Sequence, residues 1–174
     1  SPHAYALKAA MLPQQRETIA DFAVEDVVVM GRFPYKRQFR NYTRDDYEIA
    51  RTAMREVGIE AMAKRRIGSM SGGEIQRVMI AKVLAQKPEL ILMDEPTNHL
   101  DVRYKVALMN TLRAYGGTIV LVLHDLSLAA QYADHAVVMK DGRIREEGET
   151  GVVMRTELLE EIFGVPFVRF EKNG

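Results

Sequence analysis

Hydrophobic and polar positions alternate along this chain in blocks that predict helices and buried strands. Residues 90–93 and residues 119–123 form short, continuous apolar runs, which are typical of strands buried on both faces of a sheet. Residues 102–115, which lie between these runs, have helical spacing. A strand, a helix and a second strand in this order form a β-α-β unit, so we predict an α/β fold with a parallel sheet.

The segment before these strands is predicted to be helical. Residues 26–30 are apolar on one side, and residues 43–46 (Thr-Arg-Asp-Asp) form a capping box that opens a helix ending near Gly58. The apolar face of that helix consists of Tyr47, Ala50, Met54 and Val57. A further helix should start at Ser71 and end before Pro88. Its inward residues are expected to be Ile75, Val78, Met79 and Val83.

The C-terminal part of the chain has the pattern of a hairpin followed by a helix. Residues 136–139 and 143–145 are predicted strands, and Asp141 and Gly142 between them form a typical turn sequence. We expect a helix near residues 157–163 and a terminal strand near Phe167.

Composition narrows the class of protein. A chain of 174 residues with 47% hydrophobic content can bury the core of one globular domain. Lys and Arg (24) balance Asp and Glu (24), which disfavours a nucleic-acid partner, and the absence of cysteine excludes disulfides and fits a reducing cytoplasm. No apolar run approaches the roughly 18 residues that span a bilayer, and no signal peptide is evident. Any membrane association is therefore expected to come through a partner.

Residues 70–74 (Met-Ser-Gly-Gly-Glu) place a serine and two glycines at the start of a predicted helix. One interpretation is structural: Ser71 and Glu74 form a capping box, and the glycines form a turn. The other is an anion site, in which the Ser71 hydroxyl, the N–H groups of Gly72 and Gly73 and the helix dipole meet a phosphate. The residues themselves leave both interpretations open.

Asp94 and Glu95 follow the apolar run 90–93 directly, where a parallel strand delivers side chains to the carboxyl edge of its sheet. They could simply be acids at the point where a strand leaves the sheet. In the functional interpretation, the Asp94 carboxylate is a ligand of Mg²⁺, directly or through water, because Mg²⁺ prefers hard oxygen ligands. Glu95 would then polarise an attacking water as general base. His124 likewise follows the apolar run 119–123, although a lone histidine there is more often structural.

These segments resemble, in order and spacing, the signature motif, the Walker B strand and the switch histidine of ATP-binding cassette (ABC) ATPases, and the resemblance runs from about Ala4 to Phe170. It implies a RecA-like parallel sheet with an inserted helical subdomain. Residues 1–18 would belong to the core and Q-loop, residues 19–70 to the helical subdomain, and residues 71–174 to the signature helix and the rest of the core.

The resemblance also assigns roles and cofactors. Ser71, Gly72, Gly73 and Glu74 would bind the γ-phosphate of an ATP held by a second subunit, which implies a head-to-tail homodimer with ATP and Mg²⁺. His124 would contact the γ-phosphate and hold the attacking water and Glu95 in the right geometry. Gln14, in a stretch that would otherwise pass for a turn, matches the Q-loop glutamine that senses Mg²⁺ and connects to a transmembrane partner. Asp101 matches the D-loop contact across the dimer, although a helix cap is equally physical.

One element of the family is missing from this sequence. No Gly-x-x-x-x-Gly-Lys-Ser/Thr loop is present, so the cradle for the α- and β-phosphates is absent. We therefore expect an incomplete P-loop NTPase cassette that begins mid-domain, as a piece of a longer protein, and that by itself binds Mg-ATP weakly and hydrolyses it negligibly. A non-catalytic remnant that only dimerises or regulates is the alternative explanation.

Within the family, the closest resemblance is to ATPase subunits of importers for iron-siderophores, haem and cobalamin. Four segments carry this resemblance: residues 12–15, 30–34, 97–101 and 123–130. The Phe-Gly-Val at residues 163–165 also matches. This branch implies a permease partner, an indirect link to a substrate-binding protein and a place at the cytoplasmic face of the cell membrane. Soluble ABC proteins that act on ribosomes share the segment 97–101 and are the alternative.

A locally basic, aromatic stretch, residues 32–40, lies in the predicted helical subdomain. By resemblance it docks on the permease, and a solvated loop is the alternative. Phe33, Tyr35 and Phe39 are the apolar groups that would make the contact.

Overall fold

The computed structural model describes residues 1–13, 22–36 and 40–168. The chain forms two compact units, Ser1–Leu123 and His124–Gly174. The three-part division that the resemblance implies stays a prediction. Within the described residues, no helix combines the length and the apolar character that a membrane span needs.

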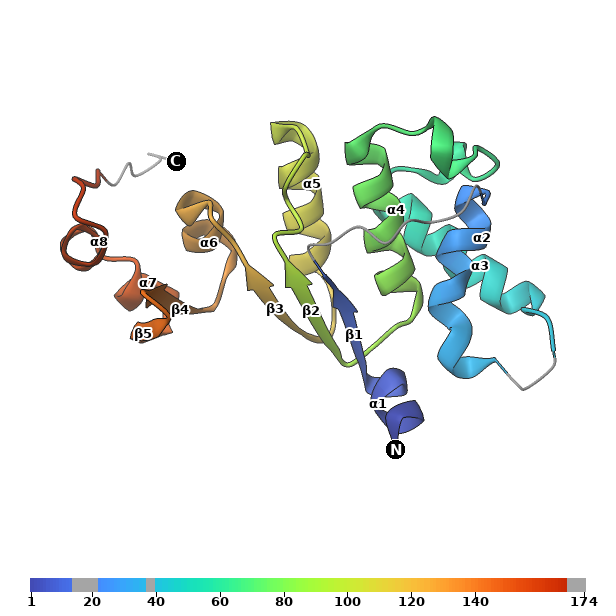
Figure 1. The fold of residues 1–174 in the computed structure, drawn as a ribbon, viewed down its shortest axis with the longest axis horizontal. Coiled ribbons are helices and arrows are strands. Elements are labelled where there is room, and N and C mark those ends of the chain that lie inside the picture. Colours follow the sequence, from blue (N-terminus) through green and yellow to red (C-terminus); the bar gives the residue numbers. More distant parts are fainter. Residues whose placement is uncertain (14–21, 37–39, 169–174) are drawn as a thin grey trace. The chain divides into compact units, whose positions relative to one another are not determined.

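The first unit contains a parallel sheet of three strands in the order β1-β2-β3 (Figure 1). These strands are β1 (Ala9–Leu12), β2 (Leu90–Asp94) and β3 (Thr118–Val122). Helix α5 (Val102–Arg113) connects β2 to β3, which confirms the predicted β-α-β unit. In register, Leu12 pairs with Met93, and Asp94 pairs with Val122.

Burial of the sheet is one-sided, contrary to the sequence prediction. Ile91 and Met93 of β2 are buried, whereas Val120 and Val122 of β3 are each 51% exposed. The prediction that residues 119–123 form a fully buried strand is therefore wrong. Among the described strands, β3 pairs with β2 alone, and the sheet face that carries Val120 is left uncovered by the described residues.

The helical part of the first unit lies between β1 and β2 in the sequence. It consists of α2 (Val24–Val29), the 3₁₀ helix η1 (Met30–Tyr35), α3 (Arg44–Glu56), the turns η2 (Glu60–Met62) and η3 (Ile67–Ser69), and α4 (Gly72–Ala85). The predicted capping box is present at the start of α3: the Thr43 N–H donates to Asp46 (2.9 Å), and the Asp46 N–H donates to the Thr43 hydroxyl (3.2 Å). Gly58, at φ 71°, follows the end of this helix as expected.

Helix α4 packs against α2, α3 and β1, and this explains a second difference from the sequence pattern. Ile75 and Met79, predicted to face inward, are only half-buried, whereas Ile80 and Ala81 are fully buried. A helix that is covered on several sides has no single apolar stripe. The sequence analysis also missed the short helix α1 (Pro2–Lys8), which Ser1 caps and in which Pro2 occupies the favoured first position.

The second unit is built on an antiparallel hairpin of β4 (His135–Lys140) and β5 (Arg143–Glu149). Asp141 (φ 53°) and Gly142 (φ 71°) form its turn, which confirms the predicted hairpin. Helices α6 (Leu126–Tyr132), α7 (Thr150–Val153) and α8 (Thr156–Phe163) complete this unit. Its core residues are Val138, Val153, Leu159 and Ile162.

The predicted terminal strand near Phe167 is wrong, because residues 165–168 are not in a strand. Gly164, at φ 72°, ends α8 and turns the chain back. Phe167 then packs on the core of the second unit and near the ring of Phe163, with centroids 6.1 Å apart. Pro166, which lacks an N–H donor, also disfavours a strand here.

Gly31 makes a close backbone contact that a side chain would prevent. A Cβ at this position would lie 2.1 Å from the Lys82 carbonyl oxygen of α4. We expect Gly31→Ala to lower the free energy of unfolding by about 1–3 kcal/mol or more, since backbone cannot move aside cheaply. Urea denaturation measures this change. Gly116→Ala is the matched control, because a Cβ there meets no atom within 4 Å; equal effects of the two substitutions would contradict the contact.

Candidate functional site

The predicted acidic pair lies at the carboxyl end of β2. Asp94 is the last residue of the strand and is half-buried. The Glu95 N–H donates to the Val122 carbonyl of β3 (3.1 Å), so its backbone is fixed to the neighbouring strand. Glu95 has a φ of 48°, a left-handed conformation that costs a residue other than glycine on the order of 1–3 kcal/mol. The sheet therefore directs both carboxylates to one edge, with Glu95 in a strained turn.

The turn after Glu95 holds its side chain as well. The Asn98 N–H donates to the Glu95 carbonyl (3.1 Å), and the Asn98 side-chain amide donates to the Glu95 carboxylate. The sequence analysis did not single out Asn98 for this contact. A side-chain amide three residues after an acid is the available signal, because turns bring such residues together.

The N-terminus of α4 carries the predicted serine-glycine segment. Its capping box is formed: the Ser71 N–H donates to the Glu74 carboxylate (2.7 Å), and the Glu74 N–H donates to the Ser71 hydroxyl oxygen (3.3 Å). The hydrogen bond from the Ser71 backbone and the nearby Arg65 guanidinium lower the pKa of the Glu74 carboxyl. The structural interpretation is thus realised. Anion binding remains compatible with it, because a hydroxyl that accepts one hydrogen bond can still donate its own proton.

The serine-glycine segment at residues 71–74 packs against the turn at residues 95–99, which follows the acidic pair. A Cβ on Gly73 would lie 2.9 Å from the His99 carbonyl oxygen, so glycine allows α4 to approach this turn closely. The Gln76 side chain donates to the Pro96 carbonyl (3.2 Å) from the same helix. These contacts place the first turn of α4 beside the segment that follows Asp94 and Glu95.

Asp101, His124 and Gln14 are the remaining predicted site residues. Asp101 caps α5 by accepting a hydrogen bond from the Tyr104 N–H (3.0 Å), which is the structural role anticipated for it. His124 opens the second unit and precedes Asp125, the cap of α6. Gln14 lies outside the described residues. Their functional roles stay predictions.

The donor set at the strand edge fits a magnesium ion that is shared with a substrate. Within the described part of the chain, no group of three or more His, Cys, Asp or Glu residues is arranged to hold a metal. Mg²⁺ does not require such a group, because it usually binds through one or two carboxylates together with phosphates and water. Asp94 supplies a half-buried carboxylate of this kind.

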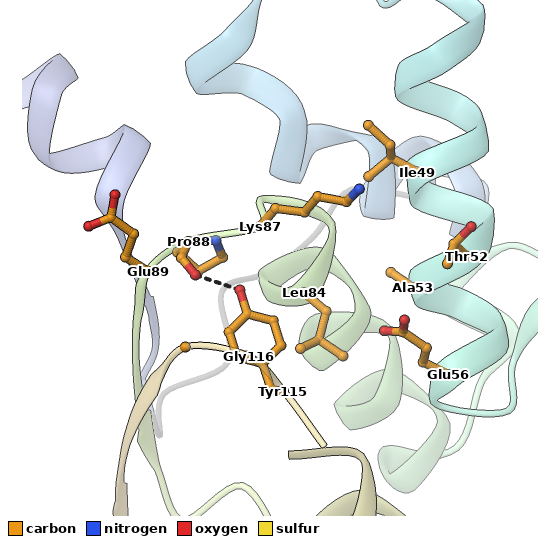
Figure 2. A pocket seen from close by; sticks show the side chains of 11 residues that line it. Ile49, Thr52, Ala53, Glu56, Leu84, Lys87, Pro88, Glu89, Tyr115 and Gly116 are labelled. Carbon is orange, nitrogen blue, oxygen red and sulfur yellow. Dashed lines mark hydrogen bonds between the residues drawn. The ribbon is translucent and has the colours of Figure 1, made fainter. Parts of the chain in front are cut away.

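A cavity of about 400 Å³ lies away from this site, where β2 and β3 begin. Figure 2 shows α3 on one side of it and Tyr115 on the other, with the Tyr115 hydroxyl donating to the Pro88 carbonyl (2.5 Å). Burial raises the pKa of Tyr115. Because the strands are parallel, this cavity lies at the opposite sheet edge from Asp94, so it is not part of the candidate site.

The family follows from sequence comparison. A profile described as "ABC transporter" matches residues 2–98, more than half of the chain. The chain belongs to the ABC transporter ATP-binding family. It is 35% identical to the ferric enterobactin transport ATP-binding protein FepC of Escherichia coli, covering 92% of this chain and 60% of that protein. It is 40% identical to the hemin import ATP-binding protein HmuV of Thermobifida fusca, covering 100% and 62%. The chain thus spans about 60% of the length of these relatives.

Solved structures confirm the fold class of this ABC-family chain. It matches a metal-chelate type ABC transporter in an inward-facing conformation with a TM-score of 0.82 at 28% identity, covering 91% of this chain and 64% of that one. It also matches a dimeric bacterial ABC transporter cassette, with a TM-score of 0.76 at 26% identity, covering 86% and 66%. The predicted α/β cassette and the resemblance to the siderophore and haem branch are confirmed.

The charge of Glu74 should stabilise the first turn of α4 in a pH-dependent way. Glu74→Gln keeps the shape of the capping box and removes the charge, so we expect a loss of about 0.3–1 kcal/mol at neutral pH. Because the folded-state pKa of Glu74 lies below its ordinary value of 4.5, its contribution is full above that value. It should then fade as the pH falls through the lower, folded-state pKa. Urea denaturation of both proteins between pH 7 and pH 3 tests this.

Glu147→Gln, on exposed β5, is the control for the loss of one negative charge. A stability difference between the unsubstituted protein and the Glu74→Gln variant that stays constant with pH would show that the carboxylate charge is not the stabilising group.

Proposed function

We propose that this chain is part of the ATP-binding and hydrolysing subunit of an ABC importer for an iron-siderophore, haem or cobalamin. The observation that carries the proposal is the close packing of the α4 N-terminus on the turn that follows Asp94 and Glu95. In a head-to-tail dimer, the helix end can bind the phosphate of the second copy's ATP, and the acidic pair can bind a metal and activate water in this copy's own site, so the contact would join the two sites. The relatives named for ferric enterobactin transport and hemin import support the importer class.

In this proposal, each residue has a defined task. Ser71, Gly72, Gly73 and Glu74 form the helix end that receives the γ-phosphate of an ATP held by a second copy in a head-to-tail dimer. Glu95 accepts a proton from the attacking water, and Asn98 orients its carboxylate. Mg²⁺, when bound through Asp94 and Gln14, supplies positive charge that neutralises the phosphates. His124 steadies the phosphate and the water, and Asp101 contacts the second copy.

Two alternatives to the importer are an ATPase with a different partner and a protein that does not hydrolyse ATP. A soluble ABC ATPase that acts on ribosomes would share the segment 97–101, and a non-catalytic remnant would only dimerise or regulate, without turnover. The importer is favoured because the relatives described above are named for transport or import and match across 92% or more of this chain.

In the importer proposal, the partner is a membrane permease. The subunit would then lie at the cytoplasmic face of the membrane, and its link to a substrate-binding protein would be indirect, through the permease. The docking surface is the exposed aromatic side of η1, where Phe33 is 69% and Tyr35 is 41% exposed. Arg32, counted with this basic stretch in the sequence, is buried and does not belong to the surface. Phe39 lies outside the described residues.

Glu95→Gln tests the catalytic assignment in the intact ATPase. The amide keeps the shape of the side chain but cannot take a proton, so hydrolysis should fall by about a hundredfold or more, while ATP still binds. ATP-loaded dimers should accumulate, as measured by size-exclusion chromatography beside a phosphate-release assay. Glu89→Gln, at the opposite sheet edge, should hydrolyse ATP normally. Turnover of the Glu95 variant near that of the control would remove Glu95 from the role of general base.

Phe33→Ala tests the docking surface. Because this ring is exposed, its loss should weaken co-purification of the intact ATPase with its permease by about tenfold, as expected for an aromatic interface residue, and should leave basal hydrolysis unchanged. Ile144→Ala, an exposed apolar residue of β5, is the control. Retained permease binding would exclude Phe33 from the interface, and loss of ribosome association instead would favour the alternative ATPase.

A further inference from the structure

Arg32 is a buried cation in η1, beside the exposed side chains of Phe33 and Tyr35. Its side chain is 10% exposed, and its Nε donates to the Asp46 carboxylate at the start of α3 (3.1 Å). Its guanidinium also stacks on the ring of Tyr35, 3.8 Å from the centroid. Burial alone would raise the pKa of the Asp46 carboxyl, but hydrogen bonds from Thr43 and Arg32 hold it below its usual value. The pair is therefore charged and hydrogen-bonded.

The other side of the same guanidinium reaches the end of α4. Arg32 Nη1 donates to the carbonyls of Ala85 (3.1 Å) and Gln86 (3.4 Å). The last carbonyls of a helix lack partners within the helix and carry the negative end of its dipole, so a cation is favourable here. Gln86 extends the connection, because its side-chain amide donates to the carbonyls of Ala6 (2.6 Å) and Ala9 (2.8 Å).

The backbone of η1 lies directly against α4 at this point. Gly31 precedes Arg32, and a Cβ on Gly31 would lie 2.1 Å from the Lys82 carbonyl. Neither segment can therefore move far without the other. Helix α4 has 14 residues, and its opposite end is the Ser71–Gly73 segment, about 21 Å away at 1.5 Å per residue.

We propose that Arg32 is a positioning residue that couples the exposed aromatic surface of η1 to the phosphate-binding end of α4. This inference rests on the proposed importer function. A partner that presses on Phe33 displaces η1, and the guanidinium passes that displacement to the helix through the Ala85 and Gln86 carbonyls. Arginine suits this task because its planar fork can bond Asp46 and the helix carbonyls at once, whereas a lysine offers a single point charge.

The test uses the intact ATPase, alone and assembled with its permease in lipid vesicles. Arg32→Lys keeps the charge and loses the fork. Its basal kcat and KM for ATP should stay within about twofold, and co-purification should persist, while the ratio of permease-stimulated to basal hydrolysis falls by about fivefold. Arg51→Lys is the matched control, since Arg51 is an exposed arginine of α3 that pairs with Glu48. The control should keep the full ratio.

A second variant guards against a simple loss of folding. Asp46→Asn removes the charge that faces Arg32 but keeps an oxygen that can cap α3, and it should lower the same ratio. An unchanged ratio in both variants, or a parallel fall of basal and stimulated rates, would overturn the coupling role. Failure of the proposed function is a separate result, because it would appear as continued hydrolysis by the Glu95→Gln protein.

Discussion

Helix α4 packs on its neighbours through contacts between glycines and backbone carbonyl groups, and the first unit depends on this constraint. Near the start of the helix, Gly73 lies against the His99 carbonyl. Near its end, the Lys82 carbonyl lies against Gly31. Contacts of this kind leave no flexible side chain to absorb a shift, so α4 and the segments that it touches at these two points constrain one another's positions. The signature segment is placed by this packing rather than by the capping box alone.

This placement has a direct chemical consequence. The sheet determines where Asp94 and Glu95 lie, and packing on the turn that follows them determines where the start of α4 lies relative to them. The turn between Glu95 and Asn98 joins the two, with Gln76 donating to its Pro96 carbonyl and Asn98 donating to the Glu95 carboxylate. A strand end and a helix end need such a bridge to keep a fixed relative position, because they lie far apart in the sequence.

Helix capping and the proposed ligand binding would use the same geometry in this protein. Ser71 and Asp101 both cap helices, and both are assigned further roles in the proposed function. Backbone N–H groups at a helix start can donate to a capping oxygen or to an anion, so a cap and a binding site are compatible at one helix end. Arg32 shows the complementary arrangement at the far end of α4, where a cation satisfies the last carbonyls.

The sequence by itself determined the local elements and the family. The β-α-β unit around residues 90–123, the capping boxes at Thr43 and Ser71 and the turn at Asp141 and Gly142 all follow from spacing and turn chemistry, which act over a few residues. The acidic pair and the signature segment were likewise identified from their order along the chain.

Tertiary structure alone decided which faces are covered and which distant groups meet. The exposure of Val120 and Val122, the burial of Ile80 and the partnership of Arg32 with the end of α4 depend on what packs beside each element. Arg32 illustrates the reason: 53 residues separate it from Ala85 in the chain, and its place in a basic, aromatic stretch suggested a surface residue. A hydrophobic pattern records that a residue can be buried, but only the arrangement of the other segments determines whether it is.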